Sequence, residues 1–413
     1  MAVLALEILF WVCVALIVWT QVGYAVVLAA LAWALKAVRG ERRPHEALGR
    51  PGAQAQAGAR PAPTCSSPPE LSLIVAAHNE EAVIGAKVAN ALALDYPRER
   101  LQVIVACDGC TDATAERARQ AGADLVLELA RGGKIRAQDA AVERARGQIV
   151  AFSDANALWQ RDAARRLVAA FENPRVGYAC GQVRYLRVAS ADGGERADAA
   201  GADGNQEGLY WRYELAIRSL ESRLSSVTGG NGAIYATRRD SYLVVDPVMG
   251  HDLSLPFNIV KRGLRATYVP DAISSEKMVP SIGGEFARKR RMASHSWPIV
   301  IRGGMLSPRG YPPGYALMIL SHRLLRYATP ALHVLALAFN LALVALGAPL
   351  PYEVTLALQI ALLAGAALAG MAPLRILLVA RYYVLTTASL AAGLWDWLRH
   401  GTDATWEAAE GTR

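Results

Sequence analysis

Long apolar runs near both ends, with a more polar middle, most constrain what this sequence can fold into. Residues 8–35 form one nearly uncharged run, and a helix needs about 20 apolar residues to cross a bilayer core. Further apolar runs near the C-terminus cover about residues 328–347, 354–372 and 374–398. The middle, about residues 70–300, has the composition of a soluble protein. We therefore expect a membrane-anchored protein with one large aqueous domain between its membrane segments.

The first apolar run is expected to be an anchor. It is longer than the 7–15 apolar residues of a signal peptide and has no basic segment before it. Basic residues follow it, namely Lys36, Arg39, Arg42 and Arg43. Such a flank stays in the cytoplasm, and so would the domain that follows. Three C-terminal spans would then place Arg413 outside, although Arg381 would also fit a broken or interfacial last segment.

These patterns divide the chain into six parts. They are an N-terminal anchor (1–36), a flexible linker rich in Pro, Ala, Gly and Gln (37–69), an aqueous domain (70–280), basic amphipathic interfacial helices (281–327), about three spans (328–398) and a tail (399–413).

The charge and the cysteine content limit the classes of binding partner and the compartment that the sequence suits. The net charge is +8, and much of it lies near the membrane boundaries, which favours anionic lipids over nucleic acid. Basic residues interleaved with aromatic ones, as nucleic-acid binding would need, are absent from the sequence. The five cysteines are scattered, as expected in a reducing compartment. Cys107 and Cys110 have CxxC spacing, but zinc would need a second ligand pair, and the sequence has none.

Within the aqueous domain, strand-like and helical segments alternate. The expected strands are Leu71–Ala77, Leu101–Ala106, Asp124–Leu129, Gln148–Ser153, Val176–Val188, Ala233–Ala236 and Arg265–Val269. The expected helices are 82–94, 112–121, 134–146, 161–172, 209–226 and 252–262, with a basic amphipathic helix at 283–301 and a loop at 189–208. This alternation predicts a mostly parallel sheet covered by helices on both faces.

An apolar strand that ends in Asp154 and Asn156 carries the first chemical signal. A carboxylate at the carboxyl end of a buried strand faces the crevice where open α/β sheets bind ligands. The two side chains could both offer oxygens to Mg2+ or Mn2+. The alternative is an Asx turn that closes the strand.

Acidic residues follow three other strands or turns in the same way. They are Glu80 with Glu81, Asp108 with Asp112, and Asp252 after His251. Each could be a helix cap or a first-turn acid. Several acids at one sheet edge would repel one another unless a cation or a ligand compensates, so together they favour a ligand site.

With these motifs in this order, the chain resembles the family-2 glycosyltransferases, in particular the membrane-integrated branch with cellulose, chitin and hyaluronan synthases. The resemblance covers about residues 70–300, and the flanking membrane segments match the branch's layout. It implies an α/β GT-A fold, a nucleotide-diphospho-sugar transferase domain with a Rossmann-like, mostly parallel sheet, joined to transmembrane α-helices. It also implies a bacterial inner-membrane protein with its catalytic domain in the cytoplasm.

The resemblance implies donor and metal roles for the first four motifs. Asn79 and Glu80 match the Asn-Glu that lies near the uracil and ribose of a UDP-sugar. Asp108 would contact the nucleoside, and Lys134, after Gly133, would lie close to the diphosphate. The Asp-x-Asp metal motif matches Asp154-Ala155-Asn156, so Asp154 and Asn156 would hold Mg2+ or Mn2+, with Asp154 also on the donor.

The later motifs imply acceptor-side and catalytic roles. Gly230 and Asn231 lie in the Gly-Gly-Asn-Gly turn that corresponds to the acceptor segment. Asp252 matches the general base. A single carboxylate that takes the proton of the incoming hydroxyl would invert the anomeric centre. Arg291 matches the Arg of the Gln-x-x-Arg-Trp motif of processive synthases.

The sequence departs from the family pattern at three places. Asn156 replaces an Asp and removes one charge from the metal motif. His251 replaces an acid, and we expect a helix-start residue there rather than a hydrogen-bond partner. Met292 replaces the Trp that stacks on the acceptor sugar, which argues against a long processive product.

We therefore expect a membrane-bound inverting glycosyltransferase. It would move a sugar from a nucleoside-diphosphate sugar, with UDP as the expected nucleotide, to a hydroxyl of a saccharide or lipid-linked acceptor in cell-surface polysaccharide or glycolipid synthesis. The alternatives are a non-processive transferase that adds one sugar to a membrane lipid, and an inactive nucleotide-sugar-binding scaffold.

Overall fold

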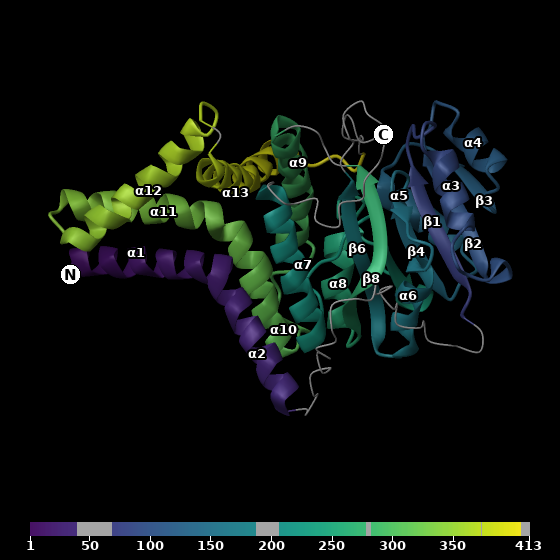
Figure 1. Cartoon of the computed structure of the whole chain (residues 1–413), viewed down its shortest axis with the longest axis horizontal. Helices are drawn as coiled ribbons and strands as arrows, with labels where there is room; N and C mark the ends of the chain where they lie inside the picture. Colours follow the sequence, from purple (N-terminus) through teal and green to yellow (C-terminus); the bar gives the residue numbers. More distant parts are fainter. Residues whose placement is uncertain (39–67, 187–205, 278–281, 373, 406–413) are drawn as a thin grey trace, which may run out of the picture.

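An eight-stranded sheet forms the centre of the aqueous part of the molecule. The computed structural model describes residues 1–38, 68–186, 206–277, 282–372 and 374–405. Most of the expected loop at 189–208 and most of the expected linker fall outside these residues; residues 206–208, expected in the loop, belong to a helix. The strand order is β3-β2-β1-β4-β7-β6-β8-β5, and helices cover both faces (Figure 1). We call residues 68–277 the sheet unit.

The strands are β1 (Leu71–Ala77), β2 (Leu101–Asp108), β3 (Leu125–Leu129), β4 (Ile149–Asp154), β5 (Leu158–Trp159), β6 (Val176–Leu186), β7 (Tyr235–Arg238) and β8 (Arg265–Lys277). The helices of the sheet unit are α3 (Ile84–Leu92), α4 (Thr114–Gln120), α5 (Lys134–Glu143), α6 (Ala163–Ala169), α7 (Gln206–Leu224) and α8 (His251–Lys261). The remaining α-helices are α1 (Ala2–Val18), α2 (Tyr24–Val38), α9 (Ile282–Ile301), α10 (Pro313–Met318), α11 (Leu325–Ala345), α12 (Leu350–Leu368) and α13 (Arg375–His400).

The parallel half of the sheet brings the strand ends of the predicted motifs to one edge. Strand β1 lies between β2 and β4 and runs parallel to both, with Ala77 opposite Cys107 and Ala76 opposite Asp154. All seven residues of β1 and all eight of β2 are buried, as expected for strands covered on both faces. The expected alternation of strands and helices is confirmed here.

The other half of the sheet differs from the expectation. Strand β7 is antiparallel to both β4 and β6, and the short β5, which was not predicted, pairs with β8. Strand β8 continues to Lys277, although an end at Val269 was expected. Its pairing with β6 shifts between Cys180 and Gln182, so Pro270 lies in a bulge where it does not interrupt the strand.

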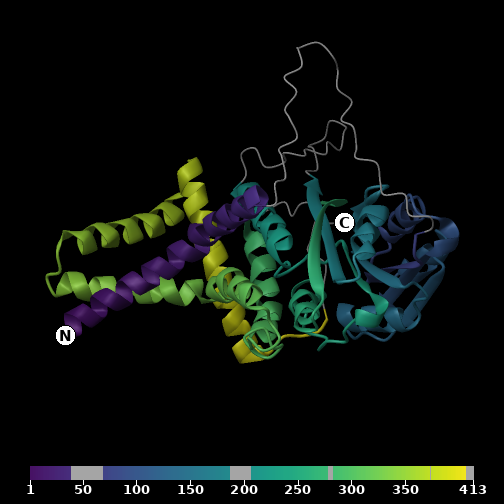
Figure 2. The same cartoon turned by 90° about the horizontal axis from the view of Figure 1, so that it is seen from below.

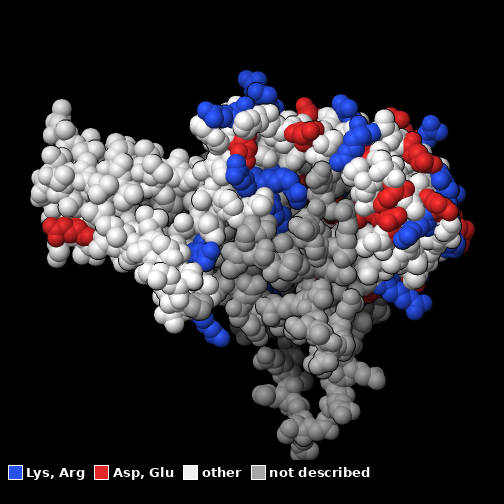
Figure 3. All heavy atoms as spheres, turned by 90° about the horizontal axis from the view of Figure 1, so that it is seen from above, with Lys and Arg blue, Asp and Glu red and all other residues white. Residues whose placement is uncertain are grey.

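Apolar helices extend from one side of the sheet unit. Among the described residues, four helical stretches are long and apolar enough to cross a membrane: Ala2–Val38, Pro313–Ala345, Leu350–Leu368 and Arg375–His400. Helices α1, α11 and α12 lie side by side, and we call them the bundle (Figures 1 and 2). The bundle surface seen in Figure 3 is almost free of charged side chains, whereas Lys, Arg, Asp and Glu cover much of the sheet unit.

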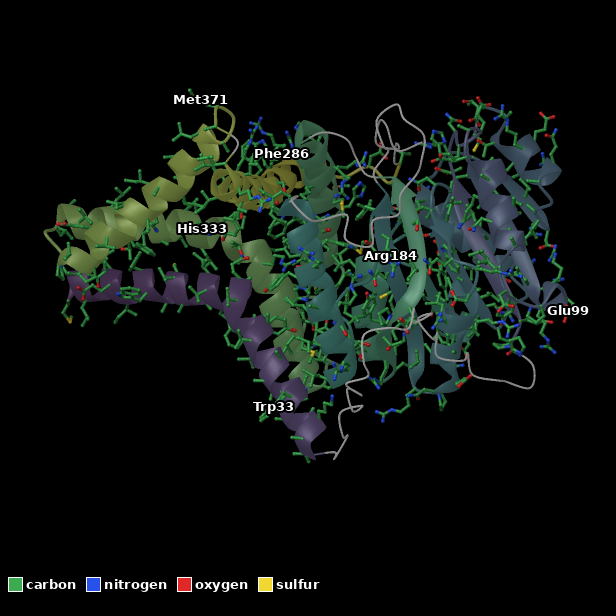
Figure 4. All side chains as sticks on the ribbon, viewed as in Figure 1. Trp33, Glu99, Arg184, Phe286, His333 and Met371 are labelled. Carbon is green, nitrogen blue, oxygen red and sulfur yellow. The ribbon has the colours of Figure 1, made fainter. Side chains whose placement is uncertain are left out.

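Two of the long helical stretches bend at the level where the bundle meets the sheet unit. A π-turn at Trp19–Gly23 separates α1 from α2, and another at Ile319–Leu324 separates α10 from α11. Such turns are a known cause of bends. The indole of Trp19 donates a hydrogen bond to Ser321 Oγ at 3.0 Å, which ties the bends together. Trp33, 72% exposed, lies on the outer side of α2 (Figure 4).

Helix α13 runs across the axis of the bundle (Figures 1 and 2). One of its faces packs on α9, where the Trp297 indole donates to the carbonyl of Leu390 at 2.9 Å and Gly393 allows close contact with Ala293. Its other face exposes apolar side chains, including Ile376, Trp395 and Leu398. The span expected at 374–398 is long and apolar enough to cross a membrane, and its orientation differs from that of the bundle helices (Figure 2).

Candidate functional site

Lys134 and Asp154 meet at the carboxyl edge of the parallel strands. Asp154 ends β4, Lys134 begins α5, and the ammonium is hydrogen-bonded to Asp154 Oδ1. Both side chains are partly exposed, at 25% for Lys134 and 32% for Asp154. Burial would lower the pKa of Lys134, but the carboxylates of Asp154, Asp252 and Glu276 outweigh it and raise the pKa. The sequence-based expectation that these groups converge agrees with this geometry.

Asp108 lies beside them, at the end of β2. Its carboxylate accepts hydrogen bonds from the amides of Gly132 at 2.6 Å and Gly133 at 3.0 Å, and it is 3.5 Å from Arg131 Nη1. Gly133 has φ +97°, a backbone conformation that favours glycine. Asp108 therefore shapes the turn that presents Lys134.

Asn79 and Glu80 form the next part of the edge, directly after β1. Asn79 adopts φ +51°, which Asn tolerates better than most residues, and its Oδ1 accepts a hydrogen bond from the Thr111 amide at 2.9 Å. The backbone amide of Glu80 donates to Thr114 Oγ1 at 2.8 Å. These contacts join the segments after β1 and β2 into one surface next to Asp108.

Asp252 reaches the same region from the first turn of α8. Its carbonyl accepts a hydrogen bond from the amide of Gly230 at 2.6 Å. Two residues on, a Cβ added to Gly232 would lie 3.2 Å from Lys134 Nζ and 3.6 Å from Asp154 Oδ2. The glycine turn at residues 229–232 thus bridges the Lys134–Asp154 pair and Asp252.

His251 begins α8, as expected, but it is also a hydrogen-bond partner, which was not expected. Its ring is buried and contacts two tyrosine hydroxyls, Tyr235 at 3.0 Å and Tyr242 at 3.3 Å. Burial and the nearby charge of Lys134 lower the pKa of His251 to about 3. The neutral ring therefore fixes the start of α8 and with it the position of Asp252.

The predicted acceptor residues differ in what they do. Asn231 is buried, and its side chain donates to the carbonyl of Gly181 at 2.7 Å and accepts from the amide of Ile234 at 2.9 Å, so it holds the turn on β6. At Gly230 an added side chain would collide with the Tyr178 hydroxyl. Arg291 is exposed on α9. Its charge lowers the pKa of His295, and the charge of Asp252 raises it.

Two charged residues at the site were not predicted. Lys87 is fully buried under the loop after β4 and donates to the carbonyl of Ala157 at 2.6 Å. Burial lowers the pKa of Lys87 to about 7, although Asp154 and Glu276 oppose this. Burial and the charge of Asp154 raise the pKa of Glu276, near the end of β8, to about 7.

These residues fit a divalent ion only in part. Among the described residues, no group of three or more His, Cys, Asp or Glu side chains could hold a metal on its own. However, Oε1 of Glu276 is buried without a hydrogen-bond partner within the described structure. Asp154, Asn156 and Glu276 would supply oxygens, and Mg2+ sites of this kind take further oxygens from substrate phosphates. The donor set therefore suits an ion that arrives with a diphosphate.

Sequence comparisons place the sheet unit among known enzymes. The profile of the family described as "Glycosyltransferase like family 2" matches residues 68–295, more than half of the chain. A beta-monoglucosyldiacylglycerol synthase of Synechocystis sp. is 34% identical over 177 residues, which are 40% of this chain and 33% of that protein. An N-acetylglucosaminyltransferase of Rhizobium sp. is 24% identical over 70% of this chain and 65% of its own length. The chain thus aligns with only a third of the first relative and about two thirds of the second.

A solved structure matches nearly the whole fold. The mannosyltransferase PcManGT from Pyrobaculum calidifontis, in complex with GDP-Man and Mn2+, superimposes with a TM-score of 0.65 at 24% identity. The match covers 95% of this chain and 99% of that one. It therefore includes the apolar helices as well as the sheet unit.

Proposed function

Because this chain belongs to glycosyltransferase family 2 and has the GT-A fold, we propose that it is an inverting glycosyltransferase of the membrane. It transfers a sugar from a UDP-sugar to a hydroxyl of a saccharide or lipid-linked acceptor. The observation that carries the proposal is the glycine turn at 229–232, which contacts Lys134 and Asp154 on one side and Asp252 on the other.

The donor is held by the first three strand ends. Asn79, Glu80 and Asp108 face the nucleoside, and Lys134 meets the diphosphate. A bound Mg2+ or Mn2+ supplies positive charge that stabilises the departing diphosphate. Lys134 exchanges part of its contact with Asp154 for the phosphate oxygens, so the chain contributes a second cation at the leaving group.

The acceptor hydroxyl is deprotonated by Asp252. The base must lie within hydrogen-bond reach of the hydroxyl as the new bond to carbon forms. The neighbouring His251 stays neutral and hydrogen-bonded to Tyr235 and Tyr242, so it keeps α8 in place without competing for the proton. One carboxylate on the side opposite the leaving group gives inversion.

Substitution of Asp252 by Asn tests the assignment of the base. The amide keeps the size of the side chain but cannot take a proton, so we expect transfer to fall by about a hundredfold or more, while UDP binding measured by calorimetry stays close to that of the unchanged protein. The matched control is Asp240→Asn, on the exposed turn after β7. Transfer that survives in the Asp252 variant would show that another group is the base.

Metal use and donor choice need separate measurements. Treatment with EDTA should stop transfer, and added Mn2+ or Mg2+ should restore it. An unchanged rate of transfer in the presence of EDTA would contradict the metal assignment.

The donor is identified with a panel of labelled UDP- and GDP-sugars, incubated with membranes that contain the protein.

A second candidate is transfer of one sugar to a membrane lipid. It is supported by Met292, which stands 48% exposed where processive synthases carry a Trp, and by the similarity to a beta-monoglucosyldiacylglycerol synthase. Sizing of the labelled product separates the candidates, because a single-sugar glycolipid and a long polymer differ in extraction and mobility.

We also propose that α13 lies along the membrane surface rather than across the bilayer. It crosses the bundle axis, exposes Trp395 and carries Arg399 over that ring at 4.8 Å, features typical of interfacial helices. Among the described helices, only α1, α11 and α12 would then cross the membrane, which places residues 401–405 on the side of the sheet unit. A cysteine at Thr402 that is labelled only from the opposite side would contradict this topology.

A further inference from the structure

The chain after α13 reaches the donor side of the sheet unit. Gly401, with φ +73°, turns it out of the helix, and residues 401–405 then run towards the sheet (Figures 1 and 2). We call residues 401–405 the C-terminal strap. A Cβ added to Gly133 would collide with the carbonyl oxygen of Ala404 and lie 2.7 Å from its carbonyl carbon. The strap therefore packs directly on the glycine whose amide holds Asp108.

The start of the strap is fixed on α9. Thr402 Oγ1 donates a hydrogen bond to the carbonyl of Ser294 at 2.9 Å. Just before it, α13 is held by the bidentate ion pair of Arg290 with Asp396, whose nitrogens and oxygens are 2.6 Å apart. These contacts determine where the strap leaves the helix pair.

The strap also brings a carboxylate towards the donor residues. The charge of Arg131 contributes to lowering the pKa of Asp403. The guanidinium of Arg131 is 3.5 Å from Asp108 Oδ2. The strap thus packs on Gly133 through the backbone of Ala404, and the charge of Asp403 lies within electrostatic range of Arg131. Neither interaction involves Asp252.

We propose that the C-terminal strap is a wall of the nucleotide site, which holds the Arg131–Gly133 turn in the conformation that positions Asp108 for the nucleoside of the donor. Its residues are positioning residues. The inference rests on the proposed donor site. It also means that α13, on the membrane surface, determines the shape of a site in the sheet unit.

A wall of this kind affects donor binding more than chemistry. Loss of a preorganising contact weakens binding because the ligand must then order the turn itself. We expect the KM for the donor to rise about tenfold, with kcat and the KM for the acceptor within about twofold of their original values. A contact that only stabilised the fold would change all three together.

Two truncations of the full chain test the strap. One ends at Gly401 and removes the strap; the matched control ends at Thr405 and keeps it. Binding of UDP and of GDP, each with Mn2+, is measured by calorimetry on the detergent-purified proteins. We expect about tenfold weaker nucleotide binding for the first variant only. Equal binding by both variants and the unchanged protein overturns the inference.

A charge reversal tests the strap without truncation. Asp403→Lys places a cation beside Arg131, whereas Asp240→Lys makes the same change on the exposed turn after β7. Weaker nucleotide binding in the first variant alone, with unchanged thermal unfolding, supports the wall. An unchanged protein that binds neither nucleotide refutes the proposed function itself, so that failure is distinct from failure of the strap.

Discussion

Two groups of acids and bases lie on opposite sides of the glycine turn, and they differ mainly in their exposure to water. The donor cluster contains Lys134, Asp154, Asp252 and Glu276. The junction cluster contains Glu214, Glu221, His322 and Arg326, and it joins α7 to the bent helix α10–α11. In the donor cluster, Asp154 is 32% exposed, whereas the junction side chains of Glu221 and His322 are 1% and 2% exposed.

The charged groups of the junction cluster pair with one another. His322 lies between Glu221 at 2.7 Å and Glu214 at 3.3 Å, and Arg326 pairs with Glu214 at 2.6 Å. Tyr24 of α2 donates to Glu221 at 2.7 Å. The cluster therefore ties both bent helices to the sheet unit.

The difference teaches how similar residues serve different purposes. A partly exposed ion pair such as Lys134–Asp154 is weaker than a buried one, and a charged ligand can exchange with it. A buried cluster leaves an uncompensated charge when one member is lost, which costs several kcal/mol. The donor cluster is suited to a changing ligand, and the junction cluster is suited to holding helices in place.

Of these substitutions, Asp154→Asn should have the largest effect. It should lower the transfer activity without changing the stability of the fold. It removes the main negative charge that would hold the metal and Lys134, so we expect transfer to fall by about a hundred- to a thousandfold. The thermal unfolding temperature should stay nearly unchanged. Asp162→Asn, which removes the surface partner of Arg166, is the control and should retain activity. Strong destabilisation by Asp154→Asn would contradict the contrast between the clusters.

Glu221→Gln should show the reverse pattern. Burial would raise the pKa of Glu221, but His322 and Arg323 outweigh it and lower the pKa, so the carboxylate is charged in the folded protein. Its loss should destabilise the protein by about 3 kcal/mol, as measured by unfolding in detergent. Glu128→Gln, which breaks an exposed pair with Arg119, should cost less than about 1 kcal/mol. Similar costs for both variants would remove the distinction.

His251→Gln sharpens the comparison with the smallest effect, because His251 is buried although it adjoins the donor cluster. The pKa of His251 is about 3 in the folded protein, below the ordinary value of 6.5. Below pH 6.5 the imidazole is therefore protonated in the unfolded chain but stays neutral in the folded protein. Stability should therefore fall as the pH drops from 6.5 towards 3, by at most about 1.4 kcal/mol per pH unit. In the variant, this loss between pH 6.5 and 5.5 should shrink; an identical slope would show that His251 does not titrate in this way.

The donor half was predictable because its signals are local. Apolar strands followed at once by Asp108 or Asp154 share one edge in any parallel sheet, and Gly133 before Lys134 marks the turn. Lys87 was missed, although its spacing from Ile84 and Ala91 puts it on the buried face of α3. The sequence signal that could have identified Lys87 was a lysine on the apolar face of a predicted helix.

The rest of the site and the membrane segments depend on contacts between distant segments. Glu276 was missed because the last strand was expected to end at Val269, and only the pairing of β8 with β6 shows that it continues to Lys277. The direction of α13 depends on its packing against α9, which hydropathy does not encode. Arg381 was the local hint of a broken or interfacial last segment, which stays a prediction.

The paired π-turns have a consequence for the lipid environment. Because α1 ends at Val18, the straight part of the first apolar helical stretch has 17 residues, which is about 26 Å at 1.5 Å per residue. That is shorter than an average hydrocarbon core of about 30 Å, even though the apolar sequence continues well beyond the bend. The bilayer around the protein should thin locally, and activity reconstituted in short-chain phosphatidylcholines should exceed that in long-chain ones.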